Sequence, residues 1–176
     1  MTYKLARDIM VPLEQYPFVS DTYTLRQAIE AMEKTQILRG KQTSLPRLAL
    51  VFDESSSELV GVLRRRDIMR GLEPTFMVGG VLEHQRKLFN VETDPNLAEL
   101  SYDKIVARIR ERADRQVRKF MRPIRVTIDY DDHIMKAVYE MVDQNVSLLP
   151  VLRDKSVVGV VRSVDVLREI VLIMDS

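Results

Sequence analysis

The chain carries the same pattern of residues twice, and this internal repeat constrains the fold more than any single motif does. A Met-x-Pro motif opens each half, at Met10 and at Met121. A Gly-Val pair, followed shortly by an aspartate, closes each half, at Gly61 and at Gly159. Because the repeat is long and unevenly spaced, it favours two related half-domains that share a cleft over a solenoid.

Each half is predicted to fold in the order strand, helix, strand, strand, helix. The predicted strands lie at 18–19, 48–52 and 59–63 in the first half and at 126–128, 148–152 and 157–161 in the second. Thr24 followed by Gln27 predicts a capping box at the first helix, and Asp131 or Asp132 is expected to cap its counterpart. Arg39 to Pro46 is an insertion that only the first half has, and its turn-forming residues predict a loop.

Composition excludes several classes of function. The chain has 27 basic and 26 acidic side chains and a net charge of +1, so nucleic acid and anionic lipid are not expected partners. Cysteine is absent, which removes disulfides and thiolate chemistry. No run approaches the roughly 18 apolar residues that span a membrane, and the start lacks a signal-peptide core, so a cytoplasmic location is expected.

Catalytic signals are missing as well. His84 and His133 have no metal-ligand spacing between them, and no nucleophile motif is recognisable. The acidic residues Asp129, Asp131 and Asp132 are interpreted as turn and capping residues rather than as a cation site. We therefore expect no enzymatic activity, no metal and no required cofactor.

The ordered recurrence of M-x-P, a helix, an apolar strand and a V-G-V-type strand before an aspartate resembles the CBS domain. Two such repeats in tandem resemble a CBS pair, or Bateman module, and only Gly71 to Gln116 falls outside the resemblance. It implies an α/β fold with two β-α-β-β-α repeats, packed through their sheets about a pseudo-two-fold axis, and a helical insertion between them. The expected boundaries are 1–71 for the first repeat, 72–116 for the insertion and 117–176 for the second repeat.

The resemblance also implies a ligand. The family's closing motif is G-h-h-T/S-x-x-D, whose aspartate binds the ribose of an adenosine nucleotide and whose hydroxyl contacts phosphate. The predicted ligand-binding residues are Asp165, Ser163, Arg162, Pro150, Arg122, Asp67, Arg64 and Arg65. The expected ligand is AMP, ADP, ATP or another adenosyl compound.

Both halves depart from this motif in the same way, because Arg64 and Arg162 stand where the family has a hydroxyl. A guanidinium there could bind phosphate oxygens, or it could fold back onto the aspartate and plug the cleft. If only one cleft binds ligand, we expect it to be the one with Asp165, because Ser163 adds a hydroxyl nearby.

The insertion between the repeats, residues 72–116, contains an amphipathic segment with the pattern of a helix, which begins near Asp94-Pro95. Its apolar stripe consists of Leu97, Leu100, Ile105, Ile109, Ala113 and Val117. Between Asp103 and Lys119 there are seven basic and three acidic side chains. Three interpretations of the segment stay open: a helix that lies on its own module, an interaction helix for a dimer or partner, or, least favoured, a nucleic-acid contact.

Together these features of the whole chain predict a free-standing regulatory module that forms a homodimer and signals to an unidentified protein. The alternative is a ligand-free structural module whose clefts are plugged by Arg64 and Arg162.

Overall fold

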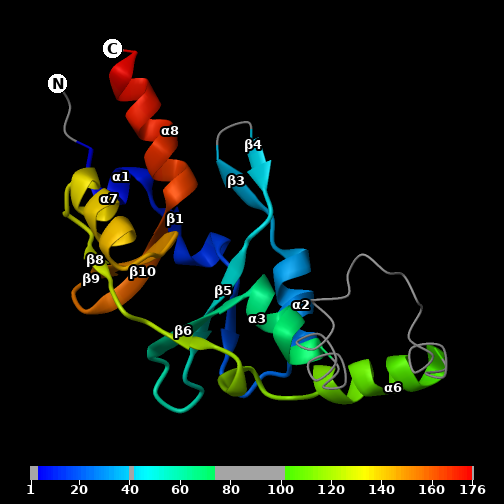
Figure 1. The fold of residues 1–176 in the computed structure, drawn as a ribbon. Helices are drawn as coiled ribbons and strands as arrows, with labels where there is room; N and C mark the ends of the chain where they lie inside the picture. Colours follow the sequence, from blue (N-terminus) through cyan, green and yellow to red (C-terminus); the bar gives the residue numbers. More distant parts are fainter. Residues whose placement is uncertain (1–3, 40–41, 74–101, 176) are drawn as a thin grey trace.

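The computed structural model describes residues 4–39, 42–73 and 102–175, and within them two four-stranded sheets carry the helices on their outer sides (Figure 1). The first repeat consists of β2 (Phe18–Ser20), α2 (Leu25–Lys34), β5 (Leu48–Phe52), β6 (Leu59–Arg64) and α3 (Arg65–Leu72). The second consists of β8 (Ile128–Asp129), α7 (Ile134–Asp143), β9 (Leu148–Arg153), β10 (Ser156–Arg162) and α8 (Ser163–Met174). The predicted order of elements is confirmed in both halves.

The segment that leads into each repeat adds a strand to the sheet of the other repeat. The first leading segment contains α1 (Ala6–Ile9), β1 (Val11–Pro12) and the 3-10 helix η1 (Leu13–Gln15). The second contains the 3-10 helix η2 (Val117–Lys119) and β7 (Arg122–Pro123). The sheet orders are β1-β10-β9-β8 and β2-β5-β6-β7, so each leading strand lies at the edge of the opposite sheet. The two repeats are therefore interlocked.

An apolar layer lies between the two sheets and confirms that the repeats pack through them. Its buried members are Val11, Tyr16, Ile37, Leu48, Leu50, Leu148 and Val160. Separate cores lie between each sheet and its helices. The β9–β10 hairpin has a two-residue turn at Asp154 and Lys155, both with positive φ, as a tight hairpin turn requires.

The N-terminal cap of α2 is the predicted one, whereas the cap of its counterpart α7 is not. Thr24 caps α2 as predicted: its Oγ1 accepts from the Gln27 amide at 3.2 Å, while the Gln27 side chain accepts from the Thr24 amide at 2.9 Å. The prediction that Asp131 or Asp132 caps α7 is wrong. The cap is His133, whose Nδ1 accepts from the Met135 amide at 3.2 Å. Asp132 instead accepts from the Asp129 amide at 2.8 Å and so closes the preceding turn.

The insertion within the first repeat forms an unpredicted hairpin. Its strands are β3 (Ile37–Arg39) and β4 (Gln42–Ser44), where the sequence had indicated only a loop. Ile37 is fully buried in the layer between the sheets, so the hairpin is anchored there.

The insertion between the repeats contains α6 (Tyr102–Ala113). Leu97, Leu100 and the predicted start at Asp94-Pro95 lie outside the described residues. Ala113 is buried, Ile105 and Val106 are half-buried and Ile109 is 38% exposed, so the helix is most closely packed at its end. At that end Arg112 Nε donates to the Gly71 carbonyl at 3.1 Å, and Arg26 pairs with Asp114 at 3.2 Å. In the described part of the chain, no helix has the length and apolar character needed to cross a membrane.

Two glycines allow the leading strands to lie close to the opposite sheets. A Cβ atom on Gly159 would lie 2.5 Å from the carbonyl oxygen of Val11, and one on Gly61 would lie 2.6 Å from that of Arg122. Carbon and oxygen atoms cannot approach so closely, so any side chain at these positions would push the strand away.

We expect Gly159→Ala to lower the free energy of unfolding by about 1–3 kcal/mol, because the Val11 backbone must shift to admit the methyl group. Urea unfolding followed by circular dichroism measures this loss. Ser156→Ala, on the exposed start of the same strand, is the control and should change stability by less than about 0.5 kcal/mol. Equal stability of Gly159→Ala and the wild type would contradict the proposed close approach.

Candidate functional site

Three guanidinium groups surround the carboxylate of Asp67 at the start of α3. Arg64, the last residue of β6, donates from Nε to Oδ2 at 2.8 Å and from Nη2 to Oδ1 at 3.0 Å. Arg122 of β7 donates from Nε to Oδ1 at 3.3 Å, and Arg70 Nη1 lies 3.6 Å from the same oxygen. We call these four residues the Asp67 cluster. Because β7 belongs to the second leading segment, the cluster draws on both halves of the chain.

The Asp67 cluster has more positive than negative charge. Burial raises the pKa of Asp67, but the hydrogen bonds from Arg64 and Arg122 outweigh it and hold that pKa below its usual value. The carboxylate therefore stays ionised at neutral pH, and the stability it contributes is lost only as pH falls through the lowered pKa. One carboxylate beside three guanidiniums leaves a positive surplus, which favours an anionic ligand.

The equivalent aspartate of the second repeat has a more enclosed environment. Arg162 donates from Nε and Nη2 to the two carboxylate oxygens of Asp165, at 2.6 and 2.9 Å. Its remaining Nη1 donates to Ser44 Oγ in β4 at 2.9 Å, and Arg168 Nη1 lies 3.7 Å from Asp165 Oδ1. We call Asp165, Arg162, Arg168 and Ser44 the Asp165 cluster. Tyr16 is buried nearby: burial raises the pKa of its hydroxyl, and the charge of Arg162 opposes that rise.

The two clusters differ mainly in the exposure of the repeat-equivalent arginines Arg64 and Arg162. The Arg64 side chain is 38% exposed, whereas the Arg162 side chain is 10% exposed. The β3–β4 hairpin, which exists only in the first half, brings Ser44 onto Arg162. Both aspartates are buried, and Arg168 is 40% exposed, so the difference lies in the arginine that grips each carboxylate: among the described residues, Arg64 is accessible and Arg162 is enclosed.

The predicted ligand-binding residues are brought together in part. Asp67, Arg64 and Arg122 meet in one cluster, and Asp165 and Arg162 meet in the other. The other predicted residues lie around them: Ser163 opens α8, Pro150 is buried in β9 opposite Val160, and Arg65 is exposed at the start of α3.

Sequence reasoning missed three members of these clusters. Arg70 and Arg168 each follow the cluster aspartate by one helical turn, and their recurrence in both halves was a usable signal. Ser44 gave no such signal, because its contact with Arg162 joins residues far apart in the sequence.

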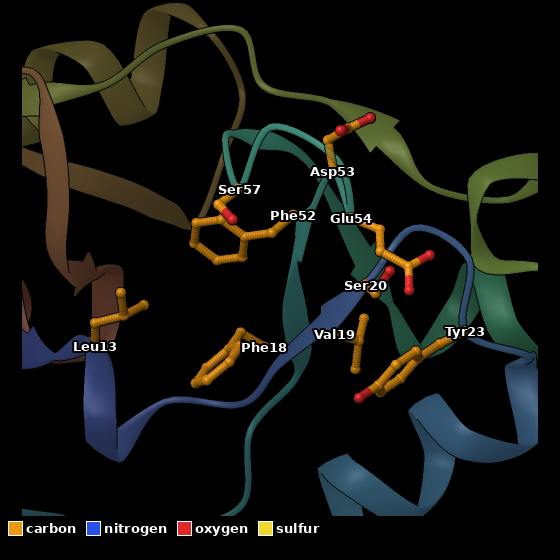
Figure 2. A pocket seen from close by; sticks show the side chains of 9 residues that line it. All are labelled: Leu13, Phe18, Val19, Ser20, Tyr23, Phe52, Asp53, Glu54 and Ser57. Carbon is orange, nitrogen blue, oxygen red and sulfur yellow. The ribbon is translucent and has the colours of Figure 1, made fainter.

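A separate pocket of about 330 Å³ lies near the edge strand β2 and contains no predicted site residue (Figure 2). Phe18 and Phe52 meet edge-to-face in it, with ring centroids 6.0 Å apart. Asp53 and Glu54 add two carboxylates to its lining. The hydrogen bond from the Ser55 hydroxyl is the main reason that the pKa of Asp53 is lowered to about 2, so its charge persists. This pocket is at the Phe52 end of β5, away from Asp67, and its charge disfavours a phosphate.

The comparisons with known proteins agree with the fold. The family model for the CBS domain matches residues 6–74 and 117–172, which together make up more than half of the chain. No curated protein sequence matches this chain.

Solved structures with the same arrangement include a CBS domain-containing protein of unknown function from Kribbella flavida. It superposes with a TM-score of 0.66 at 17% identity and covers 96% of this chain and 98% of its own. CBSX2 from Arabidopsis thaliana superposes with a TM-score of 0.61 at 16% identity, over 99% of both chains. CBSX2 in complex with AMP gives a TM-score of 0.59 at 17% identity and covers 98% of this chain and 99% of its own. At these identities the likeness shows the fold alone.

The difference in burial between the two arginines predicts different costs of removing them. We expect Arg162→Ala to lower the free energy of unfolding by about 3–5 kcal/mol, because it leaves a buried carboxylate without its two main donors. Arg64→Ala should cost about 1 kcal/mol, since Arg64 is partly solvated and Arg122 and Arg70 remain beside Asp67. Denaturant unfolding of both variants tests this, and equal losses would contradict the difference in environment.

Proposed function

Because this chain belongs to the CBS domain family, we propose that it is a regulatory module that binds an adenosine nucleotide at the Asp67 cluster. The observation that carries the proposal is the set of three guanidiniums around one carboxylate, with Arg64 and Arg122 both partly exposed. The AMP complex of the structural neighbour CBSX2 supports the choice of ligand class.

The phosphate is the part of the ligand that Arg64 and Arg122 recognise. A guanidinium presents a planar fork of donors that suits phosphate oxygens, and charge-assisted hydrogen bonds of this kind are about twice as strong as neutral ones. Arg122 makes a single contact with Asp67 at 3.3 Å, so most of its donors remain for a ligand.

The ribose hydroxyls bind Asp67 once Arg64 turns from the carboxylate to the phosphate. The carboxylate accepts hydrogen bonds from both hydroxyls, which replace those from Arg64. This exchange makes the ligand compete with an internal ion pair, so binding is weaker than at a vacant carboxylate. Since Asp67 lies in the first repeat and Arg122 leads into the second, the ligand changes how the two halves are held together.

The Asp165 cluster has a structural role in this proposal. Arg162 already makes three side-chain hydrogen bonds, to Asp165 and Ser44, and it is buried. A ligand there would have to displace all three and move the hairpin. The sequence-based expectation that the cleft with Asp165 binds the ligand, if only one cleft does, stays a prediction. The greater exposure of Arg64 than of Arg162 argues for the Asp67 side.

A second candidate function is a ligand-free module that acts through protein contacts. The folding of Arg64 onto Asp67 and of Arg162 onto Asp165 favours it, because both aspartates already have partners. The two candidates differ in whether any adenosyl compound binds.

Thermal shift and titration calorimetry with AMP, ADP and ATP test the proposal. Ligand at 100 times its dissociation constant should stabilise the wild type by roughly 2.7 kcal/mol. Arg122→Ala should weaken binding roughly tenfold to a hundredfold, because it removes a charge-assisted contact to phosphate.

Arg125→Ala is the charge-matched control. Arg125 is exposed in the same segment, so its removal changes net charge equally and should leave the affinity within about twofold. If no adenosine compound stabilises the wild type at millimolar concentration, the ligand-free candidate replaces this proposal. If binding occurs but Arg125→Ala weakens it as much as Arg122→Ala, the site assignment is wrong.

A further inference from the structure

Two segments of the chain carry most of its positive charge. Residues 64–73, which include α3, and residues 102–125, which include α6, η2 and β7, hold thirteen basic and five acidic side chains. The rest of the described chain, residues 4–39, 42–63 and 126–175, holds eleven basic and seventeen acidic ones. The net charge of +1 is therefore the sum of unlike parts, and it hides a strongly cationic one.

Six of these cations lie on adjoining elements, and we call them the basic band: Arg66 and Arg70 on α3, Lys104, Arg108 and Arg112 on α6, and Arg122 on β7. Residues four apart lie on the same side of a helix, so the α3 pair forms one row and the α6 set forms another. Five of the six are exposed, and Arg112 is half-buried. In Figure 1, α6 carries its row outward beyond α3.

Three contacts join the rows into one surface. Arg112 Nε donates to the carbonyl of Gly71, in the last turn of α3, at 3.1 Å, so the α6 row meets the α3 row. Arg70 Nη1 and Arg122 Nε lie 3.6 and 3.3 Å from the same oxygen of Asp67, which brings β7 beside α3. The band therefore runs from β7 over α3 and along α6.

The internal repeat shows that the fold does not require these charges. Arg70 has an arginine counterpart, Arg168, but other cations of the two segments have none. The counterparts of Arg66, Arg122, Lys119 and Arg125 are, in that order, Val164, Val11, Asp8 and Glu14. The same elements are therefore built with apolar or acidic residues at the equivalent positions, so packing alone does not explain the basic band.

The chemistry of the two segments fits the phosphates of a nucleic acid. Eleven of their thirteen basic side chains are arginine, whose planar fork of donors suits phosphate oxygens. Exposed cations that run over three elements match an extended polyanion better than one small anion. No aromatic side chain is exposed in residues 64–73 or 103–125, so this surface offers no ring on which unpaired bases could stack. A duplex is therefore favoured over a single strand.

An anionic membrane fits the basic band less well. A helix that lies on a membrane surface needs a free apolar face to insert. The apolar residues of α6 are turned towards their own module, since Ala113 is buried and Ile105 and Val106 are half-buried.

We propose that the basic band binds the phosphate backbone of a duplex nucleic acid, without regard to base sequence. This activity is separate from the proposed nucleotide site, because Arg66, Lys104 and Arg108 take no part in the Asp67 cluster. Composition argued against nucleic acid through the net charge of the whole chain. The uneven distribution of that charge over the described residues removes the objection.

Fluorescence anisotropy of short labelled DNA and RNA duplexes, over a range of salt concentrations, tests the proposal. The full chain should bind two unrelated sequences of the same duplex with affinities within about twofold, since phosphates carry no sequence information. The logarithm of the association constant should fall linearly with the logarithm of the salt concentration. Lys104→Ala should weaken binding to both sequences equally and make that slope shallower by about one. Arg66→Ala should do the same.

Lys34→Ala is the matched control, because Lys34 is also an exposed lysine on a helix but lies outside the basic band, on α2. It should leave the slope unchanged, and circular dichroism melting shows that each variant is folded. Binding of either duplex with these responses supports the proposal. Absence of binding to both duplexes at low salt overturns it, whether or not anionic vesicles bind. So does equal weakening by Lys34→Ala and Lys104→Ala, tighter binding of the single strand than of its duplex, or equally effective competition by polyglutamate.

Discussion

The exchange of leading strands between the repeats is the constraint on which the rest of the structure depends. β1 reaches β10 because Gly159 leaves room for the backbone of β1, and β7 reaches β6 because Gly61 leaves room for the backbone of β7. The exchange completes both sheets, holds the apolar layer between them and interlocks the halves. It also brings Arg122 beside Asp67, so the cationic Asp67 cluster is itself a product of the exchange.

The paired arginine and aspartate show how one local motif acquires two properties. In each repeat the arginine ends a strand, the aspartate lies in the first turn of the next helix, and a two-oxygen contact joins them. That geometry follows from the spacing alone. Exposure does not, because it depends on whether another element covers the arginine. Ser44 of the hairpin contacts Arg162, whereas the other side chains around Asp67 are the partly exposed Arg122 and Arg70. The arginine of the duplicated ion pair is therefore buried in one repeat and accessible in the other.

Local chemistry explains which features could be predicted from the sequence. The order of strands and helices along the chain and the Thr24–Gln27 capping box follow from periodicity and short-range patterns. The packing of sheet on sheet was instead predicted from the resemblance to a CBS pair. The cap at His133 was not, because several polar residues precede α7 and only the turn closed by Asp132 selects among them. The hairpin at Ser44 was missed because a short polar insertion gives no signal of the distant arginine that it contacts. Whether the predicted residues bind a ligand depends on whether Arg64 leaves Asp67. That depends on the free energy of the Arg64–Asp67 ion pair relative to that of the ligand contacts, which no sequence pattern gives.

The two repeats are alike at their buried positions and differ at their exposed positions. The buried positions of α2 and α7 match closely, while the outward positions differ in charge, and the hairpin encloses only one of the two aspartates. Under the proposed function, a ligand at the Asp67 cluster acts on the second repeat through Arg122 and β7. That route is short, because β7 leads within a few residues to β8 and from there to α7.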